Sequence, residues 1–97
     1  MRRVHWNNLA KLDYYDNIDY LLARWNENVA QEFIDLVDEA EFILKKGNID
    51  FRETDISGIR CYFVCKQITL FYKILDEHNI EFLRFWNNNK DKKKLKL

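Results

Sequence analysis

The chain has 97 residues, of which 47% are hydrophobic and 15% aromatic, with two glycines and no proline. A chain of this length forms one domain that buries roughly 60–65% of its unfolded surface, and this apolar content excludes an intrinsically disordered segment. No apolar run approaches the roughly 18 residues of a membrane span, and the polar start lacks the apolar core of a signal peptide. We therefore expect a single domain over residues 1–97 that resides in the cytoplasm.

Sixteen basic and sixteen acidic side chains leave no net charge, but they are unevenly distributed. The tail from Lys90 to Leu97 has five lysines and one aspartate, a balance of +4, so residues 1–89 carry −4. Because phosphate contacts need clustered lysine and arginine, a body of this charge is a poor general binder of polyanions. We expect the basic tail, residues 90–97, to be flexible. The alternative is that it contacts an acidic partner.

The N-terminal half predicts a short strand followed by a helical hairpin. Apolar residues recur at three- and four-residue steps in two successive segments, which is typical of amphipathic helices. Asn7 or Asn8 is placed to cap the first helix and Asn26 the second, and Gly47 is placed as a left-handed stop. The break between the helices is so short that they must fold back as an antiparallel pair. The predicted ranges are a strand near residues 3–6 and helices near 7–25 and 27–46.

Three runs of alternating apolar residues follow Gly58 and predict strands near residues 59–65, 68–75 and 80–86. Their connections are too short for anything but antiparallel neighbours. The second turn allows two registers: a three-residue loop puts Arg84 opposite Tyr72, whereas a two-residue loop puts it on the face of Phe71 and Lys73. The chain is thus predicted as an α+β domain: a short β-strand, an antiparallel α-hairpin, then a three-stranded antiparallel meander.

The two cysteines, Cys61 and Cys65, stand four apart on one predicted strand. Their Cα atoms are then about 13 Å apart, too far for a disulfide bond. No histidine or third cysteine is near them in sequence, so small buried side chains are preferred to a redox or metal role. We expect no cofactor and no metal.

Residues spread from Trp6 to Leu95 stand in an order and spacing that carry a resemblance. They are Trp6, Leu9, Ala10, Tyr20, Leu21, Trp25, Ala30, Phe33, the run Gly58-Ile59-Arg60, the run Tyr72-Lys73-Ile74, Ile80, the run Leu83-Arg84-Phe85-Trp86 and the run Lys93-Lys94-Leu95. The chain resembles the RelE/ParE family of toxins from type II toxin–antitoxin systems, in its plasmid-stabilisation-like branch. The resemblance implies a RelE/ParE toxin-like fold and a bacterial toxin that a cognate antitoxin holds inactive.

The sequence departs from the mRNA-cleaving members of that family. Thr69 aligns with a catalytic arginine of those members, and the tail beyond Trp86 has no tyrosine, histidine or arginine. The chain also departs from the branch that it resembles, where an Asp-x-Arg turn commonly follows the fourth strand and this sequence has Asn87–Asn89. Cleavage by 2′-hydroxyl attack needs a base, an acid and a cation for the developing phosphorane charge. No convincing base is found, since His5 and His78 lie at the far start and in a turn. The candidates for the cation are Arg60, Arg84 and Lys73, and a structural role is weighed equally for Arg60 and Arg84.

The resemblance and these departures together favour a toxin that binds a protein target, such as DNA gyrase, and is not an enzyme. One alternative is a metal-independent, ribosome-dependent mRNA endonuclease. Another is an inactive relative retained as a binding module. An antitoxin segment that orders on binding needs an apolar contact surface. The candidate surface is the apolar surplus on the predicted helices, at Tyr14, Tyr15, Ile43 and Leu44, with the open sheet face as the other candidate.

Overall fold

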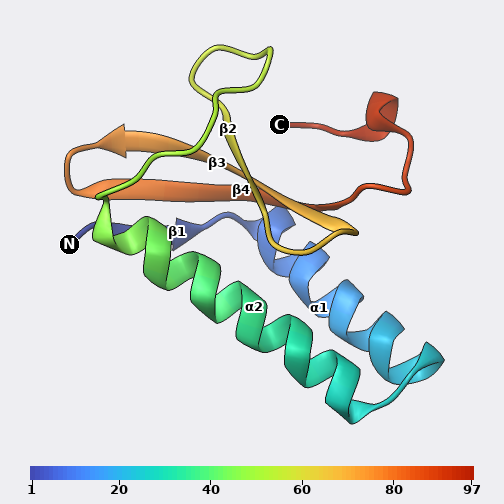
Figure 1. Cartoon of the computed structure of the whole chain (residues 1–97). Coiled ribbons are helices and arrows are strands. Elements are labelled where there is room, and N and C mark those ends of the chain that lie inside the picture. The colour runs from blue at the N-terminus through green and yellow to red at the C-terminus, as the bar shows by residue number, and fades with distance from the viewer.

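The computed structural model describes the whole chain, residues 1–97. An α-hairpin covers one face of a four-stranded sheet, and the C-terminal segment lies on the other side of the sheet (Figure 1). The predicted α+β class is confirmed. The elements are β1 (Arg3–Trp6), α1 (Asn8–Arg24), α2 (Glu27–Lys46), β2 (Arg60–Phe63), β3 (Ile68–Asp76), β4 (Asn79–Asn87) and a 3-10 turn, η1 (Lys92–Lys94).

The sheet has the strand order β1-β4-β3-β2 and is mixed. Strands β2, β3 and β4 form the predicted antiparallel meander, and β1 pairs in parallel with β4, Val4 opposite Ile80. The second strand is shorter than predicted: it ends at Phe63, because Val64 and Cys65 belong to the turn before Ile68. The preceding loop runs along the outer edge of β2, where the N–H of Cys61 donates to the Arg52 carbonyl at 3.1 Å.

Both helices begin at the asparagine caps that the sequence marks, and α2 ends at the marked glycine. The Asn7 side chain accepts a hydrogen bond from the N–H of Ala10, and Asn26 caps α2 in the same way through Val29. Each cap satisfies one of the backbone donors that the first turn of a helix leaves free. Gly47 has φ of 72°, the left-handed conformation that ends a helix at low cost only for glycine.

Two bulges in the β3–β4 hairpin set which side chains of β4 face the helices. Asp76 pairs with Asn79, so the turn is the two-residue form, and Arg84 lies opposite Phe71 as that form predicts. The pairing shifts twice on the way, leaving Leu75 unpaired on β3 and Leu83 unpaired on β4. The second bulge resets the alternation of side chains. Phe82 and Phe85, three residues apart, therefore both lie in the core.

The core lies between the sheet and the hairpin. Trp6, Tyr14, Phe82 and Phe85 form an aromatic cluster in it, with Trp6 ring centroids 5.2 Å from Tyr14 and 5.0 Å from Phe85. Its twelve buried residues are Ala10, Phe33, Val37, Ala40, Leu44, Val64, Ile68, Leu70, Tyr72, Ile80, Phe82 and Phe85.

A polar network closes the end of the core beyond α2. Arg2 binds both carboxylate oxygens of Asp50, at 2.9 and 3.2 Å. The hydrogen bond from Arg2 lowers the pKa of Asp50 below its usual 3.8. The buried Tyr72 hydroxyl accepts the N–H of Phe51 at 3.0 Å, and burial raises the pKa of this hydroxyl. The network holds the loop after Gly47 against the sheet. Neither α1 nor α2 is long and apolar enough to cross a bilayer.

Candidate functional site

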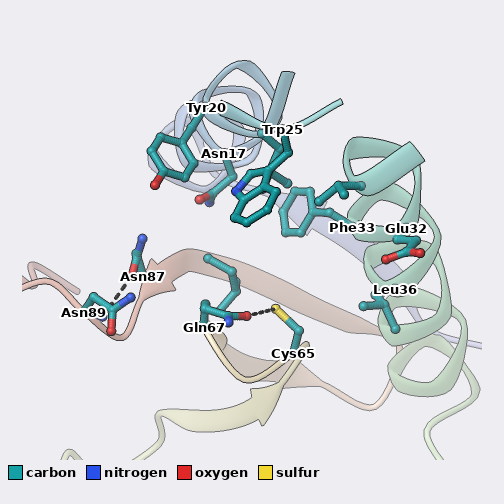
Figure 2. Close-up of a pocket in the computed structure, with 13 residues that line it drawn as sticks. Asn17, Tyr20, Trp25, Glu32, Phe33, Leu36, Cys65, Gln67, Asn87 and Asn89 are labelled. Atoms are coloured by element: carbon teal, nitrogen blue, oxygen red, sulfur yellow. Dashed lines mark hydrogen bonds between the residues drawn. The ribbon is translucent and has the colours of Figure 1, made fainter. Parts of the chain in front are cut away.

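A groove opens between the α-hairpin and one end of the sheet (Figure 2). The connecting end of the hairpin projects beyond the sheet (Figure 1). Tyr20 on α1 and Trp25 just after it are 53% and 67% exposed, although both are large and aromatic. The groove has a volume of about 460 Å³. Its walls include Tyr20, Trp25, Phe33 and Leu36, and its other side is formed by the turn before β3 and the end of β4.

The groove is lined by apolar, aromatic and uncharged polar side chains, with one carboxylate. Its polar lining consists mainly of side-chain amides, among them Asn17, Gln67 and Asn89, and contains one carboxylate, Glu32, with no histidine, lysine or arginine. Amides donate to and accept from the backbone of a bound segment, while the aromatic rings supply apolar area. The lining lacks the cation that a reacting phosphate requires.

Arg84 is held by an aspartate on α1. Its Nε donates to Asp13 Oδ2 at 2.7 Å and its Nη2 to Oδ1 at 2.9 Å, and the two side chains are only 13% and 12% exposed. The N–H of Phe85 donates to the same carboxylate at 3.1 Å. Asp13 accepts these bonds because β1 ends at Trp6, opposite Phe82, and leaves the next stretch of β4 without a strand on that edge. The hydrogen bond to Asp13 raises the pKa of Arg84. Arg84 thus joins α1 to the sheet.

The other two candidate cations have different partners. Arg60 lies opposite Tyr72, on the face that the helices cover, and its Nη1 donates to the Phe51 carbonyl at 2.6 Å. Lys73 lies opposite Glu81 on the other face, with 3.9 Å between its Nζ and Glu81 Oε1. The sheet separates Arg60 from the other two, and Arg84 is directed towards Asp13. The structure therefore does not bring the three cations together around one point.

Neither histidine adjoins Arg84. His5 is on β1, opposite Glu81, and its Nε2 lies 2.8 Å from Asn79 Oδ1. His78 is in the turn that joins β3 to β4. Both lie at the turn end of the hairpin, whereas Arg84 lies beyond the bulge at Leu83.

The C-terminal tail packs on the face of the sheet that is away from the helices. Asn88, just before the tail, accepts a 2.8 Å hydrogen bond from the buried Thr69 hydroxyl through its Oδ1. The Arg84 guanidinium and the Lys90 ammonium both approach the Trp86 ring, at 5.2 and 5.7 Å from its centroid. Leu95 and Leu97 line a second cavity, of about 490 Å³, over the same face. The sheet face expected to be open is thus partly covered, and the flexibility of residues 90–97 stays a prediction.

A protein-family model for the ParE toxin of type II toxin–antitoxin systems, parDE, matches residues 4–92. The chain belongs to the ParE toxin family. It is therefore a toxin of a type II toxin–antitoxin system, as the resemblance implied. A comparison with curated proteins finds no match.

Solved structures of toxins share the fold of this one. The chromosomal ParDE TA system from P. aeruginosa matches with a TM-score of 0.74 at 16% identity, covering 90% of this chain and 96% of that one. A copper-bound mutant toxin from Helicobacter pylori matches at 0.62 with 15% identity, covering 91% and 96%. The E. coli DinJ–YafQ complex matches at 0.60 with 13% identity, covering 90% and 93%. At these identities the likeness shows the fold alone.

The toxin does not present the four predicted antitoxin contacts as one patch. Leu44 is fully buried, because it continues the inner stripe of α2 one turn after Ala40, so its assignment to an exposed surface is corrected. Tyr14 is half-buried and packs on the core, whereas Tyr15 is 61% exposed and Ile43 is half-buried. Contact of Tyr14, Tyr15 or Ile43 with an antitoxin stays a prediction.

Sequence reasoning missed two features of the toxin. The first is Asp13 as the partner of Arg84, because a separation of 71 positions in the sequence leaves no local signal. The second is the groove. Its signal was present in Tyr20 and Trp25, which continue the apolar pattern of α1 past the end of the sheet. A hydrophobic pattern on a helix does not show how far along the helix the sheet packed against it extends.

Proposed function

We propose that this toxin acts by binding a protein target such as DNA gyrase, without cleaving RNA, and that a cognate antitoxin neutralises it by occupying the groove. The observation that carries the first part is the pairing of Arg84 with Asp13. A cation that stabilises a phosphorane must be free to face it. Since both targets considered, gyrase and the ribosome, are cytoplasmic, the proposed site of action is the cytoplasm.

Releasing Arg84 for catalysis is energetically unfavourable. Asp13 is 12% exposed and would lose both of its bonds to the guanidinium. Breaking a buried ion pair by removing one partner costs about 3–5 kcal/mol. Arg60 is held on the opposite face by the Phe51 carbonyl. This arrangement supports a structural role for both arginines and favours binding over cleavage.

Two assays on purified toxin test the mode of action. We expect inhibition of gyrase supercoiling and no mRNA cleavage on translating ribosomes. Codon-phased cuts that disappear in Arg84→Ala but persist in the exposed-site control Arg3→Ala, with an unchanged melting temperature in both, would replace this proposal with the ribosome-dependent endonuclease. Activity in neither assay would leave a toxin-like binding module.

The groove has the features of a protein docking site. Tryptophan and tyrosine are enriched among the residues that dominate binding energies, and Trp25 and Tyr20 line the groove while largely exposed. The amides beside them suit the backbone of a segment that orders on binding. The P. aeruginosa ParDE system and the E. coli DinJ–YafQ complex, similar in fold, pair a toxin with a second protein by name.

Co-expression with the small reading frame beside this gene tests neutralisation. We expect a stable complex, and Trp25→Ala should weaken it by about 2 kcal/mol or more, roughly thirtyfold in Kd. Leu75→Ala is the matched control, because Leu75 is also exposed, at 47%, but lies in the β3 bulge away from the groove. If the two proteins elute separately at micromolar concentration, neutralisation by this partner is wrong.

A further inference from the structure

Helix α1 carries large apolar side chains on both of its sides. On the inner side Ala10 is fully buried and Tyr14 and Leu21 pack against the core. By contrast, the longer α2 exposes one large apolar side chain, Phe42. Exposed apolar side chains gathered on one face of a helix mark a surface that a partner can cover. The exposed large side chains of α1 are Leu9, Leu12, Tyr15, Tyr20 and Leu22, which are 44–61% exposed.

Part of this set forms a stripe opposite the core. At about 100° per residue, residues 12, 15, 16, 19 and 22 fall on one face of the helix, directly across from residues 10, 14 and 21. All five are exposed. We name this the outer stripe: Leu12, Tyr15, Asp16, Asp19 and Leu22. It spans about 15 Å, or close to three helical turns.

The outer stripe combines apolar area with unpaired negative charge. Asp16 and Asp19 form no ion pair and accept no hydrogen bond from another residue, and Lys11 flanks the stripe without pairing to either. The surroundings reinforce the charge, since residues 8–46 hold nine acidic and four basic side chains, a balance of −5. Solvent-exposed leucines beside free carboxylates complement a surface that is apolar and basic.

We propose that the outer stripe binds a basic amphipathic helix of the antitoxin. This inference rests on the proposed neutralisation and extends the antitoxin contact from the groove onto α1. Such a helix presents apolar anchors at i, i+3 or i+4, and i+7, with lysine or arginine flanking them to meet Asp16 and Asp19. Tyr20 follows Asp16 by one helical turn and lines the groove, so a segment leaving the groove reaches the stripe without a break. A second copy of the toxin is a poorer occupant, because two facing stripes would bring four carboxylates together.

Binding of the co-expressed antitoxin to toxin variants tests the assignment. We expect Leu12→Ala/Leu22→Ala to weaken the complex roughly a hundredfold, because two leucines lose their burial. Asp16→Lys/Asp19→Lys should weaken it roughly tenfold at low salt, and by less at 1 M salt, where charges are screened. The matched control is Asp35→Lys/Glu39→Lys, which makes the same charge change at exposed positions of α2. All variants should melt as wild type does, since every altered side chain is exposed.

Each outcome decides the assignment. Wild-type affinity in both stripe variants, with the antitoxin still bound, overturns the outer stripe and leaves neutralisation through the groove standing. Tighter binding by Asp16→Lys/Asp19→Lys shows an acidic partner helix and also overturns it. Self-association of the toxin alone that is lost in Leu12→Ala/Leu22→Ala would assign the stripe to a second copy instead. If the wild-type toxin binds no antitoxin, the proposed neutralisation is wrong, and the assignment of the outer stripe is wrong as well.

Discussion

Asp13 provides the hydrogen-bond acceptor that a neighbouring strand would otherwise supply at the edge of β4. Its two carboxylate oxygens accept hydrogen bonds from Arg84 Nε, Arg84 Nη2 and the N–H of Phe85. The last of these is a backbone donor that a neighbouring strand would normally satisfy. An acceptor carried by α1 takes that position, so helix and sheet are joined by a hydrogen-bonded ion pair as well as by apolar contact.

We expect Arg84→Ala to lower the free energy of unfolding by about 3 kcal/mol, because it leaves a largely buried carboxylate without its cation. Asp13→Ala should cost at least as much, since it also frees the N–H of Phe85. Urea denaturation of both single variants and the double variant measures this, and the double should cost less than the sum. Lys73→Ala is the control and should cost less than about 1 kcal/mol, as its pair with Glu81 is looser and more exposed. Full additivity would contradict the pairing.

The Arg2–Asp50 pair makes stability depend on acidity. The pKa of Asp50 is lower in the folded chain than its usual 3.8, so the folded state favours the carboxylate. The stabilisation is present above pH 3.8 and is lost as the pH falls through the folded value. The difference in unfolding free energy between wild type and Asp50→Asn should therefore be constant near neutrality and shrink below pH 4. A difference that is unchanged down to pH 2 would show that Asp50 acts without its charge.

At the scale of elements, the ends of the helices and the bulges of the hairpin fix the fold. Asn7, Asn26 and Gly47 act locally, within a few residues of each helix end. The bulges act at longer range, because a shift of one residue turns every following side chain to the other face. Without the extra residue Leu83, regular alternation would place only one of Phe82 and Phe85 in the core.

The two glycines provide a matched pair for testing a helix end. Both have positive φ, 72° at Gly47 and 83° at Gly58, so alanine at either should cost about 1 kcal/mol of backbone strain. A Cβ at Gly47 would also lie 3.0 Å from Arg2 Nε, whereas one at Gly58 would meet nothing within 4 Å. We expect Gly47→Ala to lose more stability than Gly58→Ala in thermal melts. Adding Asp50→Asn should reduce the difference in stability between Gly47→Ala and Gly58→Ala. An equal loss of stability in Gly47→Ala and Gly58→Ala would contradict the contact with Arg2.

At the scale of the whole molecule, charge and shape divide the toxin into an acidic body and a basic tail. The tail contributes +4 and the rest of the chain −4. It lies over the sheet face opposite the hairpin, where the Lys96 carbonyl accepts from Arg84 Nη1 at 3.3 Å. The acidic hairpin with its groove and the tail-covered face are therefore different surfaces on opposite sides of one sheet.

Truncation after Asn89 should expose Trp86, which is 4% exposed in the full chain. We expect a red shift of tryptophan fluorescence and a loss of about 1–2 kcal/mol of stability, because Leu95 and Leu97 no longer cover this face. The control Lys93→Gln/Lys94→Gln removes charge but keeps the apolar cover, so it should show no shift. Unchanged fluorescence after truncation would indicate that the tail does not cover Trp86 in solution.

Much of the fold was predictable from local patterns. The helix ranges near 7–25 and 27–46 and the caps at Asn7, Asn26 and Gly47 follow from periodicity and from side chains that reach only three or four residues. The antiparallel meander follows from connections too short for any other pairing. The family followed from residues spread over most of the chain, and the match over residues 4–92 confirms it.

The candidate site was predictable only in part. Tyr15 was proposed as exposed and is, whereas Leu44 looked like surplus surface and lies in the core. A single helix does not show how wide its covered face is, because that width depends on the elements packed against it. For the same reason, the sequence did not predict the groove at Tyr20 and Trp25.

The sequence by itself determined the elements and their order, because these depend on short-range periodicity, caps and turn lengths. It also indicated the toxin family, through the resemblance carried by residues spread over most of the chain. Only the tertiary structure decided the roles of the charged side chains. Arg84 was open to two registers, and a two-residue turn with two compensating bulges places it opposite Phe71. Its pairing with Asp13 arises because β1 ends at Trp6 and α1 takes the place of a strand beside β4. Contacts between residues 71 positions apart are fixed by packing, which no local pattern encodes.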